Sequence, residues 1–346
     1  FQGCTSLRSL VISGVYDKEL YYLFGDSIDD IPESFVEITF AENSNYVDGT
    51  MFKNGVANHT VAYVIPDGTT EIKDEQFKEW YYMRAVSMPD SVTSIGSSAF
   101  SGCKGLNNIY ITDLAAWCKI SGLNNLMGYG KNLYLNGELV TNLTIPDGVT
   151  SIGDSAFGGC SGLTSVTIPS SVTSIGLWAF SGCNKIIRKL KGICYVDKWV
   201  VGVVNTSLTT AEIENTIKGI ADSAFSGCSR LASVIIPDGV ISIGNSAFHS
   251  CTELTNVIIG NGVTSIRNNA FWNCSGLKTV FYKGTTEQWK QISIGGSNYL
   301  LTGATRYYYS ETEPSLNADG TAYNGNYWHY DSDGKTPLIW KKETIG

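Results

Sequence analysis

The sequence repeats itself with a period of 23 residues, and this period restricts the fold more than any local motif does. The phrase SIGDSAFGGC (151–160) returns with small changes as SIGLWAFSGC (174–183) and SIGNSAFHSC (242–251). Its phenylalanines are spaced by 23, 57, 23, 45, 23 and 23 residues, at Phe77, Phe100, Phe157, Phe180, Phe225, Phe248 and Phe271. A period of about 20–50 residues is typical of a solenoid, whose coils pack only against their neighbours.

One copy shows why the repeat predicts a coil. LTSVTIP (163–169) alternates apolar and polar residues around Val166, as a half-buried strand does, and Pro169 ends it because proline has no N–H to donate. SSVTSIG (170–176) is predicted to be an extended or turn segment with its apolar residues inward. LWAFSGC (177–183) is predicted to form one short helical turn.

The copies and their interruptions divide the chain into three parts. We predict a degenerate N-terminal repeat region (1–64), a repeat array (65–282), and a C-terminal variant coil with a capping hairpin (283–346). Inside the array we expect an inserted variant coil (113–144) and an inserted hairpin (191–212).

The variant coils at 113–144 and after residue 283 share a tryptophan followed three residues later by isoleucine. Both then reach a strand that carries tyrosine, so we expect one longer type of coil with a genuine helix in place of the tight turn. Trp117 and Cys118 are predicted to lie in its core.

Two segments are predicted to be hairpins. GICYVDKWVVGVV (192–204) alternates around an Asp-Lys turn, and NYWHYDSDGKTPLIW (326–340) contains an Asp-Gly-type turn. The second hairpin is expected to cover the last coil, since the ends of a solenoid must be capped. DSDG (331–334) lacks the other ligands of a calcium loop, so we interpret it as that hairpin's turn.

Cysteine occupies a fixed place in the repeat. Seven of the nine cysteines stand there, namely Cys4, Cys103, Cys160, Cys183, Cys228, Cys251 and Cys274. No CxxC pair accompanies them, so metal or redox sites are disfavoured and a buried, reduced packing column is predicted. Occasional disulfides between coils are the alternative. One copy has Trp80 in this column, which a reactive site would not tolerate.

Composition excludes several classes of function. The net charge is -8 and no cluster of Lys and Arg appears, which disfavours nucleic-acid binding. No apolar run approaches the roughly 18–20 residues of a membrane span. His59, His249 and His329 stand apart from any acid or nucleophile pattern, so we predict no catalytic residue, metal or cofactor. The opening FQGCTSLRSL resembles the middle of a repeat, so we expect an excerpt of a longer chain whose targeting signal lies upstream.

The repeated pattern IPxxVTxIGxxAFxxCxxL resembles the BspA-type leucine-rich repeat family, and the resemblance covers nearly the whole chain. It implies an α/β, leucine-rich-repeat solenoid that is curved, with a parallel sheet on the concave face and short helical turns and loops on the convex face. It also implies a secreted or surface-anchored protein, because members are found on bacterial surfaces and several act as adhesins.

The strands of such a solenoid present an outward position just after the core residue. Ligand-binding candidates at this position are Tyr110, Ile235, Ile258 and Phe281. The last three fall on consecutive coils and are expected to form an apolar ladder, which marks a partner site if it is exposed. The alternative is that the inserted hairpin or the C-terminal segment covers them.

We therefore predict a non-enzymatic, monomeric protein, extracellular or at the cell surface, that binds a protein partner through its concave face. A glycan is the alternative ligand. A structural spacer that displays another domain is the alternative function.

Overall fold

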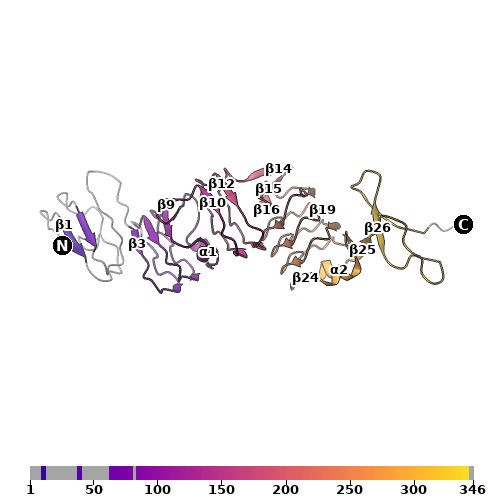
Figure 1. Ribbon diagram of the computed structural model, residues 1–346, viewed down its shortest axis with the longest axis horizontal. Helices are drawn as coiled ribbons and strands as arrows, with labels where there is room; N and C mark the ends of the chain where they lie inside the picture. Colours follow the sequence, from indigo (N-terminus) through magenta and orange to yellow (C-terminus); the bar gives the residue numbers. More distant parts are fainter. Residues whose placement is uncertain (1–8, 13–36, 41–61, 81–82, 343–346) are drawn as a thin grey trace. The chain divides into compact units, whose positions relative to one another are not determined.

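The protein was analysed as a computed structural model that describes residues 9–12, 37–40, 62–80 and 83–342. Contacts group the chain into two compact units. Unit 1 comprises Phe1–Pro169 and Trp178–Ile186, and unit 2 comprises Ser170–Leu177 and Ile187–Gly346. Each unit is a stack of coils built from short, mostly parallel strands with little helix (Figure 1).

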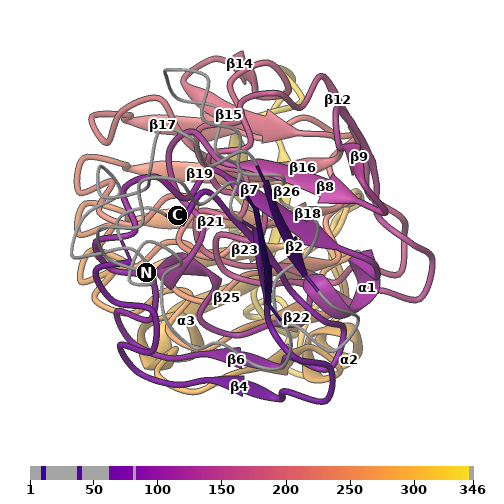
Figure 2. The ribbon, with the colours of Figure 1, turned by 90° about the vertical axis from the view of Figure 1, so that its left-hand side faces the viewer.

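Each regular coil contributes two strands to two different sheets. The longer strand carries the alternating apolar residues, and after a proline or glycine corner the Ser-Ile pair forms a second, two-residue strand. Figure 2 shows the pair of short strands β4 (Glu71–Ile72) and β6 (Ser94–Ile95) on a different side of the coil from the long strands β7 (Asn108–Ile111) and β8 (Asn132–Leu135). The segment 170–176, expected to be extended or turn, thus contains the short strand β13.

The predicted helical turn around each phenylalanine is instead a run of tight hydrogen-bonded turns. Around Phe248, the His249 N–H donates to the Ser246 carbonyl (3.0 Å) and the Cys251 N–H donates to the Phe248 carbonyl (3.2 Å). Ser246 and Ser250, two residues before and after Phe248, have φ of 53° and 59°. A left-handed residue on each side stops the right-handed turn from growing into a helix.

Unit 1 contains a five-stranded sheet in the order β3-β5-β7-β8-β9 and the smaller pairs β1-β2, β4-β6 and β10-β12. All these pairings are parallel except that of β8 with β9. The elements are β1 (Ser9–Ile12), β2 (Glu37–Phe40), β3 (Ala62–Val64), β4 (Glu71–Ile72), β5 (Ala85–Ser87), β6 (Ser94–Ile95), β7 (Asn108–Ile111), α1 (Leu114–Trp117), η3 (Leu123–Asn125), β8 (Asn132–Leu135), β9 (Glu138–Leu139), β10 (Asn142–Thr144), β11 (Ser151–Ile152) and β12 (Ser165–Thr167).

Unit 2 contains two seven-stranded sheets. The long-strand sheet has the order β17-β19-β21-β23-β25-β26-β27, and the short-strand sheet has the order β14-β15-β16-β18-β20-β22-β24. The elements are β13 (Ser174–Ile175), β14 (Arg188–Leu190), β15 (Ile193–Val196), β16 (Trp199–Val203), β17 (Thr210–Glu212), β18 (Gly219–Ile220), β19 (Ser233–Ile236), β20 (Ser242–Ile243), β21 (Asn256–Ile259), β22 (Ser265–Ile266), β23 (Thr279–Tyr282), α2 (Thr286–Lys290), β24 (Ser293–Ile294), α3 (Tyr299–Gly303), β25 (Thr305–Tyr309), β26 (Tyr327–Tyr330) and β27 (Pro337–Ile339).

The core of each unit consists of columns of identical residues. Phe225 stacks on Phe248 with ring centroids 4.9 Å apart, and Phe248 stacks on Phe271 at 5.0 Å. In unit 1, Phe157 stacks on Phe180 at 5.4 Å. Because every coil repeats its apolar residues at the same places, each buries them against the next coil rather than within itself.

The variant coils and hairpins follow the sequence pattern. The predicted helices appear as α1 and α2, and Trp117 and Cys118 are buried, with the Trp117 indole donating to the Ala156 carbonyl (2.9 Å). The predicted hairpins appear as β15–β16 and β26–β27, both antiparallel.

In the N-terminal region the structure describes β1 and β2, which pair in parallel. Of the degenerate region predicted for 1–64, residues 1–8, 13–36 and 41–61, which include Cys4 and His59, lie outside the described residues.

Candidate functional site

The apolar ladder predicted from the sequence exists in unit 2. On the long-strand sheet, Ile235 pairs in register with Ile258, and Ile258 with Phe281. The row continues to Tyr307 on β25 and begins at Glu212 on β17. The three apolar side chains therefore lie side by side on the outer face of the sheet, the face opposite the Phe column.

Two of the three members of this ladder are covered, which is one of the two alternatives that the sequence left open. Ile258 is 2% exposed and Phe281 is 6% exposed, whereas Ile235 is half-buried. Trp328 on β26 packs over them: it is 0% exposed, and its ring lies 5.4 Å from that of Phe281. Its indole N–H donates to the Tyr282 carbonyl at 3.0 Å. The C-terminal segment thus covers the ladder, which is one of the two covers that the sequence left open.

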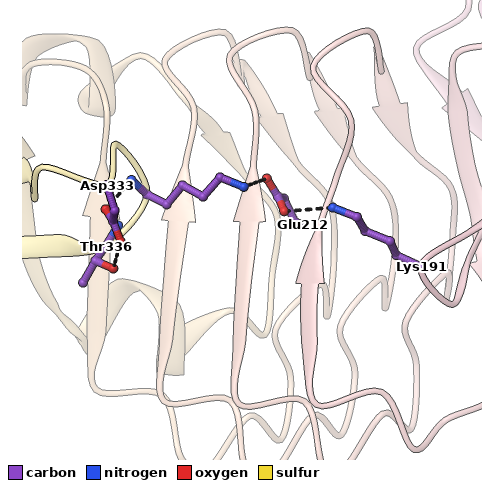
Figure 3. A network of polar contacts seen from close by, with 5 residues as sticks. Lys191, Glu212, Asp333 and Thr336 are labelled. Atoms are coloured by element: carbon purple, nitrogen blue, oxygen red, sulfur yellow. Dashed lines mark hydrogen bonds and ion pairs between the residues drawn. The ribbon is translucent and has the colours of Figure 1, made fainter.

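Charged groups extend this cover across the sheet (Figure 3). The turn between β26 and β27 carries Lys335, whose Nζ lies 2.9 Å from Oε1 of Glu212. Glu212 is on β17, at the far edge of the same sheet, so this ion pair spans β19, β21, β23 and β25. The other carboxylate oxygen of Glu212 is 3.2 Å from Nζ of Lys191. Hydrogen bonds from both lysines lower the pKa of Glu212 below its ordinary value. A second ion pair, Lys283–Asp238 at 2.5 Å, stands beside the same face.

The turn at 331–336 is held by its own side chains. Asp333 accepts from the backbone N–H groups of Lys335 and Thr336, both at 2.7 Å, and from the Thr336 hydroxyl (Figure 3). Its carboxylate is therefore used within the turn, as the hairpin interpretation of DSDG predicted.

In unit 1 the outward position carries aromatic side chains that remain partly exposed. Tyr110 on β7 pairs in register with Tyr134 on β8, and the two rings stack with centroids 4.7 Å apart and an interplanar angle of 23°. Both are half-buried. Leu139 on β9, 44% exposed, lies beside Tyr134 in the register. Of the four predicted site residues, Tyr110 is the aromatic one that is itself partly exposed, and it stacks on a partly exposed ring.

The polar neighbours of this pair are uncharged. One register step away, the Asn132 side-chain amide donates to the Asn108 side-chain oxygen at 3.0 Å. The outward positions of β5 are Ala85 and Ser87. Partial burial, with a smaller effect of Tyr134, raises the pKa of the Tyr110 phenol. The face thus presents neutral hydrogen-bonding groups and ring edges, a composition typical of protein-binding surfaces.

Sequence reasoning missed Tyr134, Trp328 and the hairpin that joins β8 to β9. The hairpin turn is Asn136-Gly137, with φ of 52° and 84°, and Asn-Gly is the strongest sequence signal for such a turn. Tyr134 follows Tyr110 by 24 residues, one more than the 23-residue period, because the variant coil lies between them. A register alignment of NIYI with NLYL would have found it.

The cysteine column is a packing and hydrogen-bonding element. Its described members are all buried, and Cys160, Cys183, Cys228, Cys251 and Cys274 form no disulfide. Cys183 Sγ donates to the Phe157 carbonyl at 3.0 Å, and Cys274 Sγ donates to the Phe248 carbonyl at 3.0 Å, each 26 residues earlier. Burial raises the pKa of Cys160 and of Cys183 to about 12. These thiols are protonated at neutral pH and so are poor nucleophiles.

The described part of the chain holds neither a metal-binding cluster nor a membrane-spanning helix. No group of three or more His, Cys, Asp and Glu side chains among those residues is placed to hold a metal ion. No helix among them is long and apolar enough to cross a membrane.

Comparison with known proteins agrees with the repeat. A family model described as BspA type leucine rich repeat region matches in six copies, over residues 1–118, 129–191 and 204–300. No match was found among curated proteins.

Among solved structures, a leucine rich cell surface protein from Faecalibacterium prausnitzii is similar at 23% identity, over 69% of this chain and 94% of that one, with a TM-score of 0.25. A leucine-rich repeat protein from Bacteroides ovatus is 19% identical over 86% of this chain and 64% of its own, with a TM-score of 0.27. The pneumococcal vaccine antigen PcpA is 14% identical over 89% and 79%, with a TM-score of 0.30.

Proposed function

Because the chain belongs to the BspA-type leucine-rich repeat family, we propose that it is a non-enzymatic, adhesin-like binding protein of the cell surface or the extracellular space. In this proposal a protein of a host or of another microbe is held on the outer face of the unit 1 sheet. The single observation that carries the proposal is the stacked pair Tyr110–Tyr134, partly exposed on that face.

The chemistry of the pair suits a protein partner. Tyrosine is enriched among the residues that dominate binding energy, because it offers a large apolar ring at low cost in side-chain entropy. Two rings already stacked lose little further freedom when a partner arrives. The neighbouring amides of Asn108 and Asn132 supply donors and acceptors for orientation.

The covered ladder of unit 2 favours a second candidate function, that of a structural spacer. Ile258 and Phe281, the most apolar outward residues, are closed off by Trp328 and are not available as anchors. In a spacer, neither outer face would bind, and the chain would display another part of a longer protein.

Binding of the chain to a panel of purified extracellular-matrix proteins and to intact bacterial cells distinguishes the two functions. We expect Tyr110→Ala and Tyr134→Ala to weaken binding by roughly tenfold or more, as truncation of an interface hot spot does. The matched control is Tyr299→Ala, since Tyr299 is 62% exposed and lies on α3 rather than on this face. Binding that Tyr110→Ala leaves unchanged would exclude this face, and no binding across the panel would favour the spacer.

A further inference from the structure

A hollow of about 310 Å³ lies on the turn edge of unit 1, away from the stacked tyrosines. It is bounded by the loop after η3 and by the turns that precede and follow Phe157 and Phe180. Two exposed aromatic residues line it: Tyr129, 97% exposed, and Trp178, 65% exposed. This volume is at the lower end of the range of about 300–1,000 Å³ for small-molecule sites.

Trp178 stands where the repeat does not otherwise place an aromatic residue. The position two residues before the phenylalanine has a left-handed backbone in every described copy, with φ of 57° at Trp178. Its equivalents are Glu75, Ser98, Ser155, Ser223, Ser246 and Asn269. A bulky residue in this region of backbone space is a genuine outlier and costs of the order of 1 kcal/mol or more. Neither burial nor core packing accounts for it, because most of the ring is in solvent.

The hollow exists because its floor lacks side chains. Gly158 and Gly159 are buried, and Gly159 approaches the loop so closely that an added Cβ would lie 1.5 Å from the Gly128 carbonyl oxygen. The position after the phenylalanine is Gly158 here, whereas it is His249 and Trp272 in two coils of unit 2, where those rings stack 4.8 Å apart.

The lining is uncharged. Between the two aromatic residues it offers the hydroxyls of Ser155 and Ser181, the amide of Asn124 and the glycine backbone. Tyr129 is flanked by Gly128 and Gly130, so its ring is free to adjust to a bound molecule. Neither a charged ligand nor a metal ion finds a partner in this set.

We propose that the hollow is a carbohydrate subsite that takes a neutral pyranose ring between Tyr129 and Trp178. A pyranose presents C–H faces that pack on aromatic rings and hydroxyls that pair with serine, amide and backbone groups. The small volume favours one or two sugar rings over an extended peptide. This site is separate from the protein-binding face and does not depend on it.

The test uses the whole chain, labelled with ¹⁵N, and follows the tryptophan indole N–H resonances during titration. The probes are methyl β-glucopyranoside, methyl β-galactopyranoside, maltotriose and triacetylchitotriose. We expect at least one saccharide to shift the Trp178 resonance, which is assigned as the signal missing from Trp178→Ser. Tyr129→Ala should weaken binding roughly tenfold in this titration, and Trp178→Ser should do so when the same saccharide is titrated by calorimetry, the effect of losing one stacked ring.

Folding is controlled within the same variants. Trp178→Ser restores the residue that four other copies carry at this left-handed position, so its melting temperature should be equal to or above that of the parent. The control Trp272→Ser, at a tryptophan that is 39% exposed in unit 2, should leave saccharide binding unchanged. The proposal is overturned if no saccharide shifts the Trp178 resonance, or if a proline decamer shifts it and the saccharides do not.

Discussion

Removing the indole of Trp328 is expected to uncover the apolar ladder of unit 2. A buried aromatic side chain removes about 150–250 Å² from water, which at about 25 cal/mol per Å² corresponds to about 4–6 kcal/mol. Measured truncations of buried Phe and Trp cost about 3–5 kcal/mol. Trp328→Ala should therefore lower the free energy of unfolding of the C-terminal coils by about 3–5 kcal/mol, with Ile258 and Phe281 exposed.

The contribution of the ring can be separated from that of its hydrogen bond. Trp328→Phe keeps an aromatic contact with Phe281 but leaves the Tyr282 carbonyl without its 3.0 Å donor. An unpaired buried acceptor costs about 1–3 kcal/mol, so this variant should fall between the parent and Trp328→Ala.

Urea denaturation and hydrogen exchange together test this reasoning. Because a solenoid is held together by contacts between neighbours, the faster exchange should concentrate in β21, β23 and β25 rather than spread through the chain. The control Trp272→Ala removes a partly exposed tryptophan from the same unit. A loss for Trp328→Ala within about 0.5 kcal/mol, the usual range for surface substitutions, would refute the idea that β26 seals this face.

Three further outcomes follow from the contacts described above. Because burial raises the pKa of Cys183 to about 12, the folded chain keeps a proton that the unfolded chain releases above about pH 8.5. The stability present at neutral pH should therefore fall as the pH rises towards 12, and it should fall less in Cys183→Ala. Urea midpoints measured for both chains at pH 8 and pH 10 test this, and equal shifts in the two chains would contradict it. Glu212→Gln should speed amide exchange in the turn at 331–336 with little change in melting temperature. In the parent, the two lysines lower the pKa of Glu212, so its ion pairs should persist above the ordinary carboxyl pKa and be lost as the pH falls through the lowered value. Equal exchange rates in parent and variant would argue against a role for Glu212 in holding this turn. Gly159→Ala should lower the melting temperature by several degrees, because the added Cβ would lie 1.5 Å from the Gly128 carbonyl oxygen. The control Gly162→Ala should leave the melting temperature unchanged, since an added Cβ there has no atom within 4 Å. Equal melting temperatures for the two variants would show that the loop carrying Gly128 moves aside freely.

The repeat allowed the coil, the core columns and much of the register to be predicted. Residues spaced by 23 must stack if the coils stack, which is why Ile235, Ile258 and Phe281 are neighbours as expected. The burial of the described column cysteines was predictable for the same reason, since each coil brings one thiol to the same place.

The cover over the ladder was not predictable from the period. Trp328 lies 47 residues beyond Phe281 in a segment that does not repeat, and its docking depends on tertiary packing that no local pattern encodes. The hollow beside Trp178 did have a sequence signal, since Trp178 stands at a position where four other copies carry serine. The sequence alone did not show that this position has a left-handed backbone, which is what makes a tryptophan there unusual. The repeat sets the coils, and departures from it mark the candidate sites.

The bonds between coils also bear on how such a gene can change length. Thr255 donates its hydroxyl to the Ala232 carbonyl at 3.1 Å, and Thr264 donates to the Ile241 carbonyl at 3.3 Å, each spanning 23 residues. Unequal crossing-over that adds or removes one whole coil would preserve every such pairing, whereas insertion of a single residue would break the register on both sides. A coil gained or lost as a whole elsewhere in the chain would therefore leave the hollow beside Trp178, which is lined by neighbouring coils, unchanged.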